Sequence, residues 1–128
     1  MISHPTAAEL AEAVAAFDAE VAAPGDARHA FLARVADNAR AILEREARDG
    51  ARLEAEAVER LAALVDQAGD HAALNARLCQ ALRDGTLSPL DPALLAHLRA
   101  TAIAQIAIDQ PAYGGLGALL EADGDRVA

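Results

Sequence analysis

The stretch that decides the fold is residues 91–109, with the sequence DPALLAHLRATAIAQIAID. It opens with Asp91 and Pro92, a helix cap followed by a proline at the first helical position. Pro111 ends the helix, because proline cannot continue it. Residues 100–108 carry no charge on any side, and a helix that is apolar all round is buried all round. The sequence therefore predicts a buried helix over residues 91–109.

The apolar sides of this helix also bear on assembly. Ile103 and Ile108 point away from the main stripe, so one neighbouring helix cannot cover every apolar side. The helix is therefore either the centre of a bundle or the seam of a dimer. Monomers rarely expose such a patch, and we expect a homodimer around a two-fold axis. Ile106 should be among the most buried residues. The main stripe consists of Leu95, Leu98, Ala102 and Ile106.

Further helices are expected on the N-terminal side of this one. Thr6 and Glu9 form a capping box, and Asp26 and Asp70 are N-caps of two later helices. The helix that begins at Asp26 has an inward apolar stripe of Phe31, Val35, Ala39 and Ile42. The expected helices and their stop signals are 6–23 (ended by Pro24 and Gly25), 26–49 (ended by Gly50), 53–68 (ended by Gly69) and 70–83 (ended by the loop 84–90).

The connections between these helices are short, so neighbouring helices should run antiparallel. The sequence after Pro111 is glycine-rich and predicts a loop with one short helical turn. Residues 1–5 and 121–128 are expected to be frayed. The fold prediction is all-α: a single domain over residues 1–128, forming an up-and-down helical bundle of five main helices with a possible short sixth.

Composition narrows the class of protein. The chain has 128 residues, of which 54% are hydrophobic, and it carries a net charge of -9. A chain of this length and apolar content can form a core without metal or disulfide. The negative charge disfavours nucleic acid and anionic membranes as partners. The sequence shows neither a signal peptide nor an apolar run that could span a bilayer, and we expect a cytoplasmic protein.

Known catalytic and metal-binding patterns are not evident in the sequence. The four histidines (His4, His29, His71 and His97) lack the spacings that place two metal ligands on one helix face, so ordinary surface or boundary positions are expected. Cys79, the single cysteine, lies in the middle of a helix and is expected to be a small buried hydrophobe. We therefore predict no catalytic residue, no metal site and no cofactor.

Several polar residues occupy positions at which the helical pattern predicts apolar ones. A buried amide without a hydrogen-bond partner costs about 1–3 kcal/mol, so such groups either pair with one another and fix the helix register, or line a polar pocket. We prefer the interpretation that these groups pair with one another and fix the helix register. The residues are Asn38, Asn75, Thr101 and Gln105.

Four strings of residues, in chain order, resemble a family of small bacterial helical proteins, a domain of unknown function. The resemblance extends from Pro5 to about Leu120, and it departs from the family at Gln110, where the family often has Asn. It implies a setting beside aminoglycoside-phosphotransferase-like kinases and acyl-CoA dehydrogenase-like flavoproteins, and it carries no established catalytic residue. The strings are Phe31-x-x-Arg34-Val35-Ala36-x-Asn38 with Glu44-Arg45-Glu46; Leu74-Asn75 with Leu78; Asp91-Pro92 with Leu95-x-x-Leu98; and Ile108-Asp109-x-Pro111-x-Tyr113.

Two functions are predicted from these observations. The first is a non-catalytic accessory or interaction domain that works with a phosphotransferase-like kinase or an acyl-CoA dehydrogenase-type enzyme. The alternative is a binding module for an acyl-CoA or a phosphorylated metabolite. Its pocket would lie between the helices 26–49, 70–83 and 91–109, with forked Arg donors suited to phosphate or carboxylate. The candidate binding or fold-signature residues are Arg34, Asn38, Asn75, Arg99, Asp109 and Tyr113.

Overall fold

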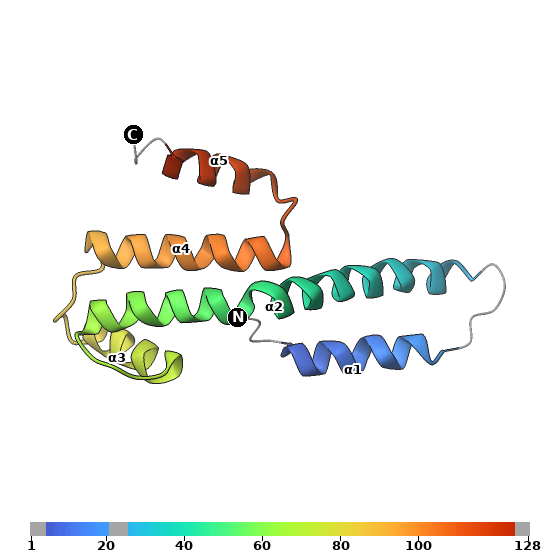
Figure 1. The fold of residues 1–128 in the computed structure, drawn as a ribbon, viewed down its shortest axis with the longest axis horizontal. Coiled ribbons are helices and arrows are strands. Elements are labelled where there is room, and N and C mark those ends of the chain that lie inside the picture. Colours follow the sequence, from blue (N-terminus) through green and yellow to red (C-terminus); the bar gives the residue numbers. More distant parts are fainter. Residues whose placement is uncertain (1–4, 21–25, 125–128) are drawn as a thin grey trace. The chain divides into compact units, whose positions relative to one another are not determined.

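The computed structural model describes residues 5–20 and 26–124, which form helices and no strand. The predicted all-α class is confirmed. By its internal contacts the chain falls into two compact units, Met1–Ala51 and Arg52–Ala128. The up-and-down arrangement of the helices stays a prediction. The helices are α1 (Ala7–Asp18), α2 (Ala27–Val65), α3 (His71–Arg83), α4 (Pro92–Asp109) and α5 (Gly114–Gly124) (Figure 1).

Gly50 does not end a helix. The two helices predicted at 26–49 and 53–68 are one continuous helix, α2, and Gly50 is buried within it. A glycine inside a helix costs about 1 kcal/mol relative to alanine, which the good helix formers on both sides outweigh. A Cβ at position 50 would lie 2.7 Å from Cδ of Glu46, so this glycine leaves room for a neighbouring side chain.

In the unit Met1–Ala51, α1 lies antiparallel beside the first part of α2 (Figure 1). The predicted capping box is present: Glu9 N donates to Thr6 Oγ1 at 3.2 Å, and Thr6 N donates to Glu9 Oε2 at 2.8 Å. Asp26 Oδ1 accepts from the amides of Arg28 and His29, as expected of a cap. The helix α1 ends at Asp18, earlier than predicted, and Pro24 and Gly25 lie outside the described residues.

Side-chain contacts join α1 to α2. Arg40 forms an ion pair with Asp18, and the rings of Phe17 and His29 stack with their centroids 4.8 Å apart. The predicted inward stripe of α2 is wrong at two positions, because the side chains of Phe31 and Val35 are 56% and 51% exposed. Ala39 is buried as predicted, and Ala36, which was not part of the predicted stripe, is buried beside it against α1.

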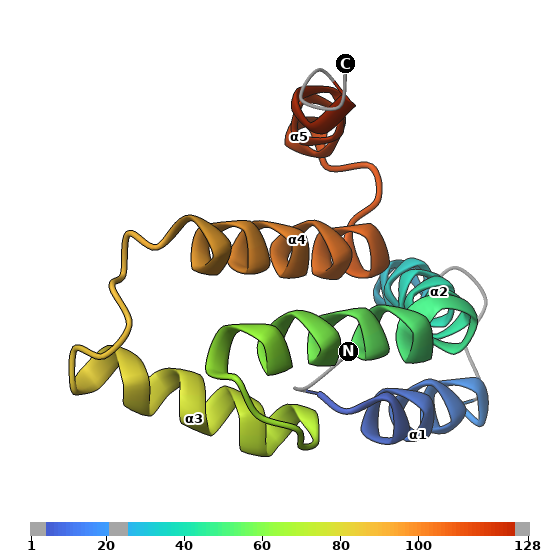
Figure 2. The same cartoon turned by 60° about the vertical axis from the view of Figure 1, so that its left-hand side comes forward.

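In the unit Arg52–Ala128, α3 and α4 flank residues 52–65 of α2 (Figure 2). Asp70 caps α3 by accepting from Ala73 N at 2.8 Å, and Asp91 caps α4 by accepting from Ala93 N at 2.8 Å, both as predicted. All three helices contribute to one apolar core. Its buried members are Leu61, Leu74, Leu78 and Leu94.

The helix α4 is buried on one face, and this face is not the predicted one. Leu95 and Leu98 are 48% and 51% exposed, Ala102 is exposed and Ile106 is half-buried, so the predicted main stripe faces outward over most of its length. The physical reason is that apolar residues occupy almost every side of α4, so hydropathy alone does not select a face. The buried residues of α4 are Leu94, His97, Ala104 and Ile108.

The C-terminal segment forms a helix longer than the single turn predicted. α5 runs from Gly114 to Gly124, and residues 1–4 and 125–128 lie outside the described residues. The fraying expected of the two ends stays a prediction. The guanidinium of Arg99 donates to the carbonyl oxygen of Leu119 and thereby joins α5 to α4. Leu116 is buried.

Candidate functional site

Two of the predicted site residues lie on α2 in the unit Met1–Ala51. Arg34 is exposed; its Nη1 donates to the carbonyl oxygen of Ala30 at 3.3 Å, and its guanidinium carbon lies 5.8 Å from the centre of the Phe31 ring. Asn38 is also exposed, so the prediction of an inward-facing amide is wrong here. It fails because Ala36 and Ala39, rather than Val35 and Ile42, set the buried face of this helix segment.

The other predicted residues lie in the unit Arg52–Ala128. Asn75 is exposed on α3, since Leu74 and Leu78 occupy the buried face, and its predicted inward position is wrong. Asp109 is half-buried and accepts a hydrogen bond from Gln105 Nε2 at 2.7 Å, so the amide of Gln105 has a partner within α4.

Tyr113 belongs to a shallow cavity at the end of α4. The cavity has a volume of about 230 Å³ and is lined by Ile106, Asp109, Gln110 and Tyr113. The Tyr113 ring packs over Gly115, where an added Cβ would lie 2.6 Å from the ring carbon Cε1. The structure thus brings together two predicted residues, Asp109 and Tyr113, whereas Arg99 is engaged with Leu119.

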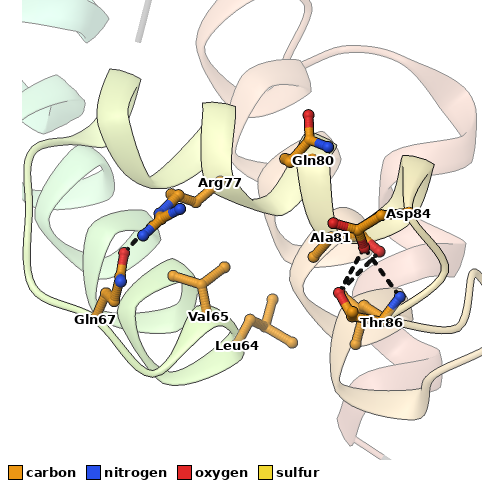
Figure 3. A pocket seen from close by; sticks show the side chains of 9 residues that line it. Leu64, Val65, Gln67, Arg77, Gln80, Ala81, Asp84 and Thr86 are labelled. Atoms are coloured by element: carbon orange, nitrogen blue, oxygen red, sulfur yellow. Dashed lines mark hydrogen bonds between the residues drawn. The ribbon is translucent and has the colours of Figure 1, made fainter.

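A second cavity, of about 280 Å³, lies where α2 and α3 end (Figure 3). Gln67 Oε1 accepts from Arg77 Nε at 2.9 Å on one side of it. On the other side Thr86 Oγ1 and Asp84 Oδ1 are 2.7 Å apart, and the hydrogen bonds from Thr86 lower the pKa of Asp84. These polar groups pair with one another at the rim. The cavity is slightly below the size at which small-molecule pockets begin, about 300 Å³.

His97 is a buried polar group that was not predicted. A surface or boundary histidine was expected, but His97 is 5% exposed in the unit Arg52–Ala128. Burial lowers the pKa of His97, and the positive charges of Arg60 and His71 lower it further. Three polar atoms near this position are buried and form no hydrogen bond with any residue that the structure describes: His97 Nδ1, Arg60 Nε and Thr101 Oγ1.

A signal for this face was present in the sequence. His97, Thr101 and Gln105 follow one another at four-residue spacing, which places them on one side of the helix. Leu94, Ala104 and Ile108 lie on that same side and are buried. Treating His97 as the companion of Thr101 and Gln105 would have predicted the inward face of α4.

On the opposite side of α4 the exposed residues are apolar, and the half-buried Arg99 lies among them, where its guanidinium donates to the carbonyl oxygen of Leu119 on α5. Every exposed residue of this helix is apolar, and the charged residues Arg99 and Asp109 are both half-buried. Leu90, directly before the helix, is 78% exposed and extends the surface. We call it the α4 outer face; it comprises Leu90, Pro92, Ala93, Leu95, Ala96, Leu98 and Ala102.

Among the residues that the structure describes, no three His, Cys, Asp or Glu side chains lie together in a way that could hold a metal ion. Within the same residues, no helix has both the length and the apolar content needed to cross a membrane. Cys79 is half-buried on α3 and forms no disulfide.

Residues 23–113 match the family model described as "Domain of unknown function (DUF6285)". The chain belongs to this family. The match covers α2, α3 and α4, and both α1 and α5 lie outside it. The predicted membership of an uncharacterised domain family is confirmed over this range, which is shorter than the predicted resemblance. Neither a curated protein nor a solved structure matches the DUF6285 chain.

Proposed function

We propose that this DUF6285 chain is a non-catalytic, cytoplasmic accessory domain that binds a partner enzyme through the α4 outer face. The observation that carries the proposal is that every exposed residue of α4 is apolar. Soluble proteins tolerate single exposed leucines, but a contiguous apolar surface typically marks an interaction site. The α4 residues that the sequence predicted to be buried, among them Leu95 and Leu98, would then be buried against the partner enzyme.

The spacing of the apolar residues on the α4 outer face suits the binding of α4 in an apolar groove of a partner protein. Leu95, Leu98 and Ala102 are spaced three and four residues apart, which is the pattern that an amphipathic helix uses to anchor in an apolar groove of its partner. The opposite face of α4 is held by Leu94 in the core of the same unit. The outer face is therefore presented on a supported element.

The kind of partner comes from the family resemblance described above. It points to a phosphotransferase-like kinase or an acyl-CoA dehydrogenase-type flavoprotein. The net charge of -9 is compatible with an enzyme partner and disfavours a nucleic acid.

The proposal is tested by copurification from the native host under gentle conditions, with a tagged chain and identification of bound proteins by mass spectrometry. The test variant is Leu98→Glu, and the matched control is Ala76→Glu, which adds the same charge at an exposed position of α3. We expect a kinase or flavoprotein with the natural chain and with the control. Leu98→Glu should reduce recovery to background, because an unpaired charge would be buried in the interface. Recovery of the bare natural chain, or unchanged recovery with Leu98→Glu, would overturn the proposal.

The alternative, a binding module for an acyl-CoA or phosphorylated metabolite, stays a prediction. The cavity of about 280 Å³ at the ends of α2 and α3 is small for an acyl-CoA. A thermal-shift screen with acyl-CoAs and nucleotides tests this alternative. A saturable rise in melting temperature with one ligand class would favour it over the accessory domain.

A further inference from the structure

The helix α4 ends in a carboxylate at the negative end of its own dipole. Asp109 is the last residue of this helix, and the last turn contains no basic residue. The helix dipole places a partial negative charge at the same end and adds to the charge of the carboxylate. Asp109 is half-buried, and among the residues that the structure describes no arginine forms an ion pair with it. A cation beside Asp109 would be stabilised by both negative charges.

The carboxylate of Asp109 is oriented by a neutral neighbour. Gln105 Nε2 donates to Asp109 Oδ2 at 2.7 Å. Because an amide carries no charge, this hydrogen bond fixes the carboxylate without cancelling its negative charge. Asp109 lines the cavity of about 230 Å³ at the end of α4, and its Oδ1 is left to accept a hydrogen bond from a ligand there.

Tyr113 gives the same cavity an aromatic side. Its backbone is fixed on both sides, since Tyr113 N donates to the carbonyl oxygen of Gln110 at 2.8 Å and Leu116 N donates to that of Tyr113 at 2.9 Å. The ring packs over Gly115, where an added Cβ would lie 2.6 Å from the ring carbon Cε1. A side chain at position 115 would therefore displace the ring, and glycine leaves the room that the ring occupies.

These groups favour one class of ligand. A carboxylate attracts an ammonium ion, an aromatic ring adds a cation–π attraction, and Ile106 provides an apolar contact for alkyl groups. An anion would be repelled by Asp109. A metal ion needs several ligand atoms, and the described residues contain no group of three His, Cys, Asp or Glu that could hold one. The net charge of -9 raises the concentration of cations near the protein.

We propose that the cavity at the end of α4 binds a small organic ammonium ion. The ammonium group lies between the carboxylate of Asp109 and the ring of Tyr113, and its alkyl groups contact Ile106. A volume of about 230 Å³ suits a small amine rather than a drug-sized ligand, for which pockets begin at about 300 Å³. The site goes beyond the proposed function and shares no residue with the α4 outer face, so each can fail without the other.

The experiment is an NMR titration of the isotope-labelled full chain with propylammonium chloride and, separately, with tetramethylammonium chloride. Only the first cation can donate a hydrogen bond to Asp109, so the two titrations distinguish a primary amine from a quaternary ammonium ligand. We expect saturable shifts of the amide signals of Gln110, Tyr113 and Gly115, with a Kd in the millimolar range for at least one of the cations. Sodium chloride and sodium propionate should give no saturable shift. Saturable shifts with sodium chloride, or none with either ammonium salt, would overturn the proposal.

The charge of Asp109 is tested by Asp109→Asn, which keeps the shape of the side chain. This variant should weaken binding about tenfold, because a hydrogen bond to a charged group is lost. The matched control Asp84→Asn removes the same charge at an exposed position after α3 and should keep the affinity of the natural chain. Unchanged affinity in Asp109→Asn, or an equal loss in both variants, would overturn the proposal.

The ring is tested by two pairs of variants. Tyr113→Leu should weaken binding about threefold, whereas Tyr113→Phe keeps the aromatic ring and should retain the affinity. Gly115→Ala should weaken binding as Tyr113→Leu does, because the added Cβ displaces the ring. Gly114→Ala is its control, since nothing lies within 4 Å of an added Cβ there. Equal affinities in Tyr113→Leu and Tyr113→Phe would contradict the role of the ring. Circular dichroism spectra of all variants verify that each is folded.

Discussion

His97 is a titratable side chain buried in the unit Arg52–Ala128, and its burial makes stability depend on pH. The pKa of His97 lies below its usual value of 6.5. Burial is the largest cause, and the positive charges of Arg60 and His71 lower this pKa further. Between the folded pKa and about 6.5 the unfolded chain therefore binds more protons than the folded one. We predict that the free energy of unfolding falls as the pH is lowered through this window.

Urea unfolding at pH 7.5, 6.5 and 5.5, followed by circular dichroism, checks this prediction. His97→Leu should reduce the loss of stability between pH 7.5 and 5.5. The control Leu78→Ala, which weakens the core of the same unit without removing a titratable group, should keep the pH dependence of the natural chain. The same pH dependence in His97→Leu as in the natural chain would contradict the assignment.

Leu61 has no exposed surface and lies in the core formed by α2, α3 and α4. Truncation to alanine removes three heavy atoms from this core and leaves a cavity. We predict that Leu61→Ala lowers the free energy of unfolding by about 2–5 kcal/mol. Ile106→Ala should cost less, because Ile106 is half-buried. The exposed control Arg48→Ala should stay within about 0.5 kcal/mol of the natural chain. Chemical denaturation of the three variants measures these differences, and a cost for Ile106→Ala above that for Leu61→Ala would contradict the described core.

At the scale of the elements, α2 is one helix through Gly50. Proline inside a helix removes a hydrogen bond and clashes with the preceding turn, at a cost of about 3 kcal/mol or more. We predict that Gly50→Pro destabilises the chain by at least this amount and lowers its helical circular dichroism signal. Ala27→Pro is the matched control, because position 27 is the first residue of α2, where proline is tolerated. If residue 50 were a linker between two helices, Gly50→Pro would be as mild as Ala27→Pro.

The starts of α1, α2, α3 and α4 could be predicted from the sequence because a cap is a local interaction. Thr6, Asp26, Asp70 and Asp91 each accept hydrogen bonds from amides two or three residues later. The continuity of α2 could not be predicted in this way. Glycine is compatible with both a helix end and a close approach inside a helix, and here the side chain of Glu46 occupies the space beside Gly50.

The inward face of α4 could not be predicted from hydropathy, because the helix is apolar on nearly all sides. Packing against α2 and α3 selects Leu94 and His97 and leaves Leu95 and Leu98 exposed. The positions of the candidate site residues could not be predicted from hydropathy either. Asn38 and Asn75 were placed inward from neighbouring apolar residues, whereas the buried faces in the structure run through Ala36 and Leu74.

At the scale of the whole molecule, each unit has its own source of stability and its own surface. The unit Arg52–Ala128 has a leucine core and presents the α4 outer face. The unit Met1–Ala51 buries mainly alanine and leaves a groove open. Both surfaces are apolar, and this is the observation behind our proposal of an interaction domain.

The central claim is that Leu98 faces solvent in the free chain while Leu94 is in the core. Thiol labelling tests it most directly, with Leu98→Cys and Leu94→Cys compared in a Cys79→Ala background under native conditions at low micromolar concentration. We predict that Leu98→Cys reacts at a rate close to that of the unfolded chain, and that Leu94→Cys reacts at least tenfold more slowly, because a buried thiol reacts only after local opening. Equal protection of the two thiols would contradict the claim and place the α4 outer face inside the folded protein.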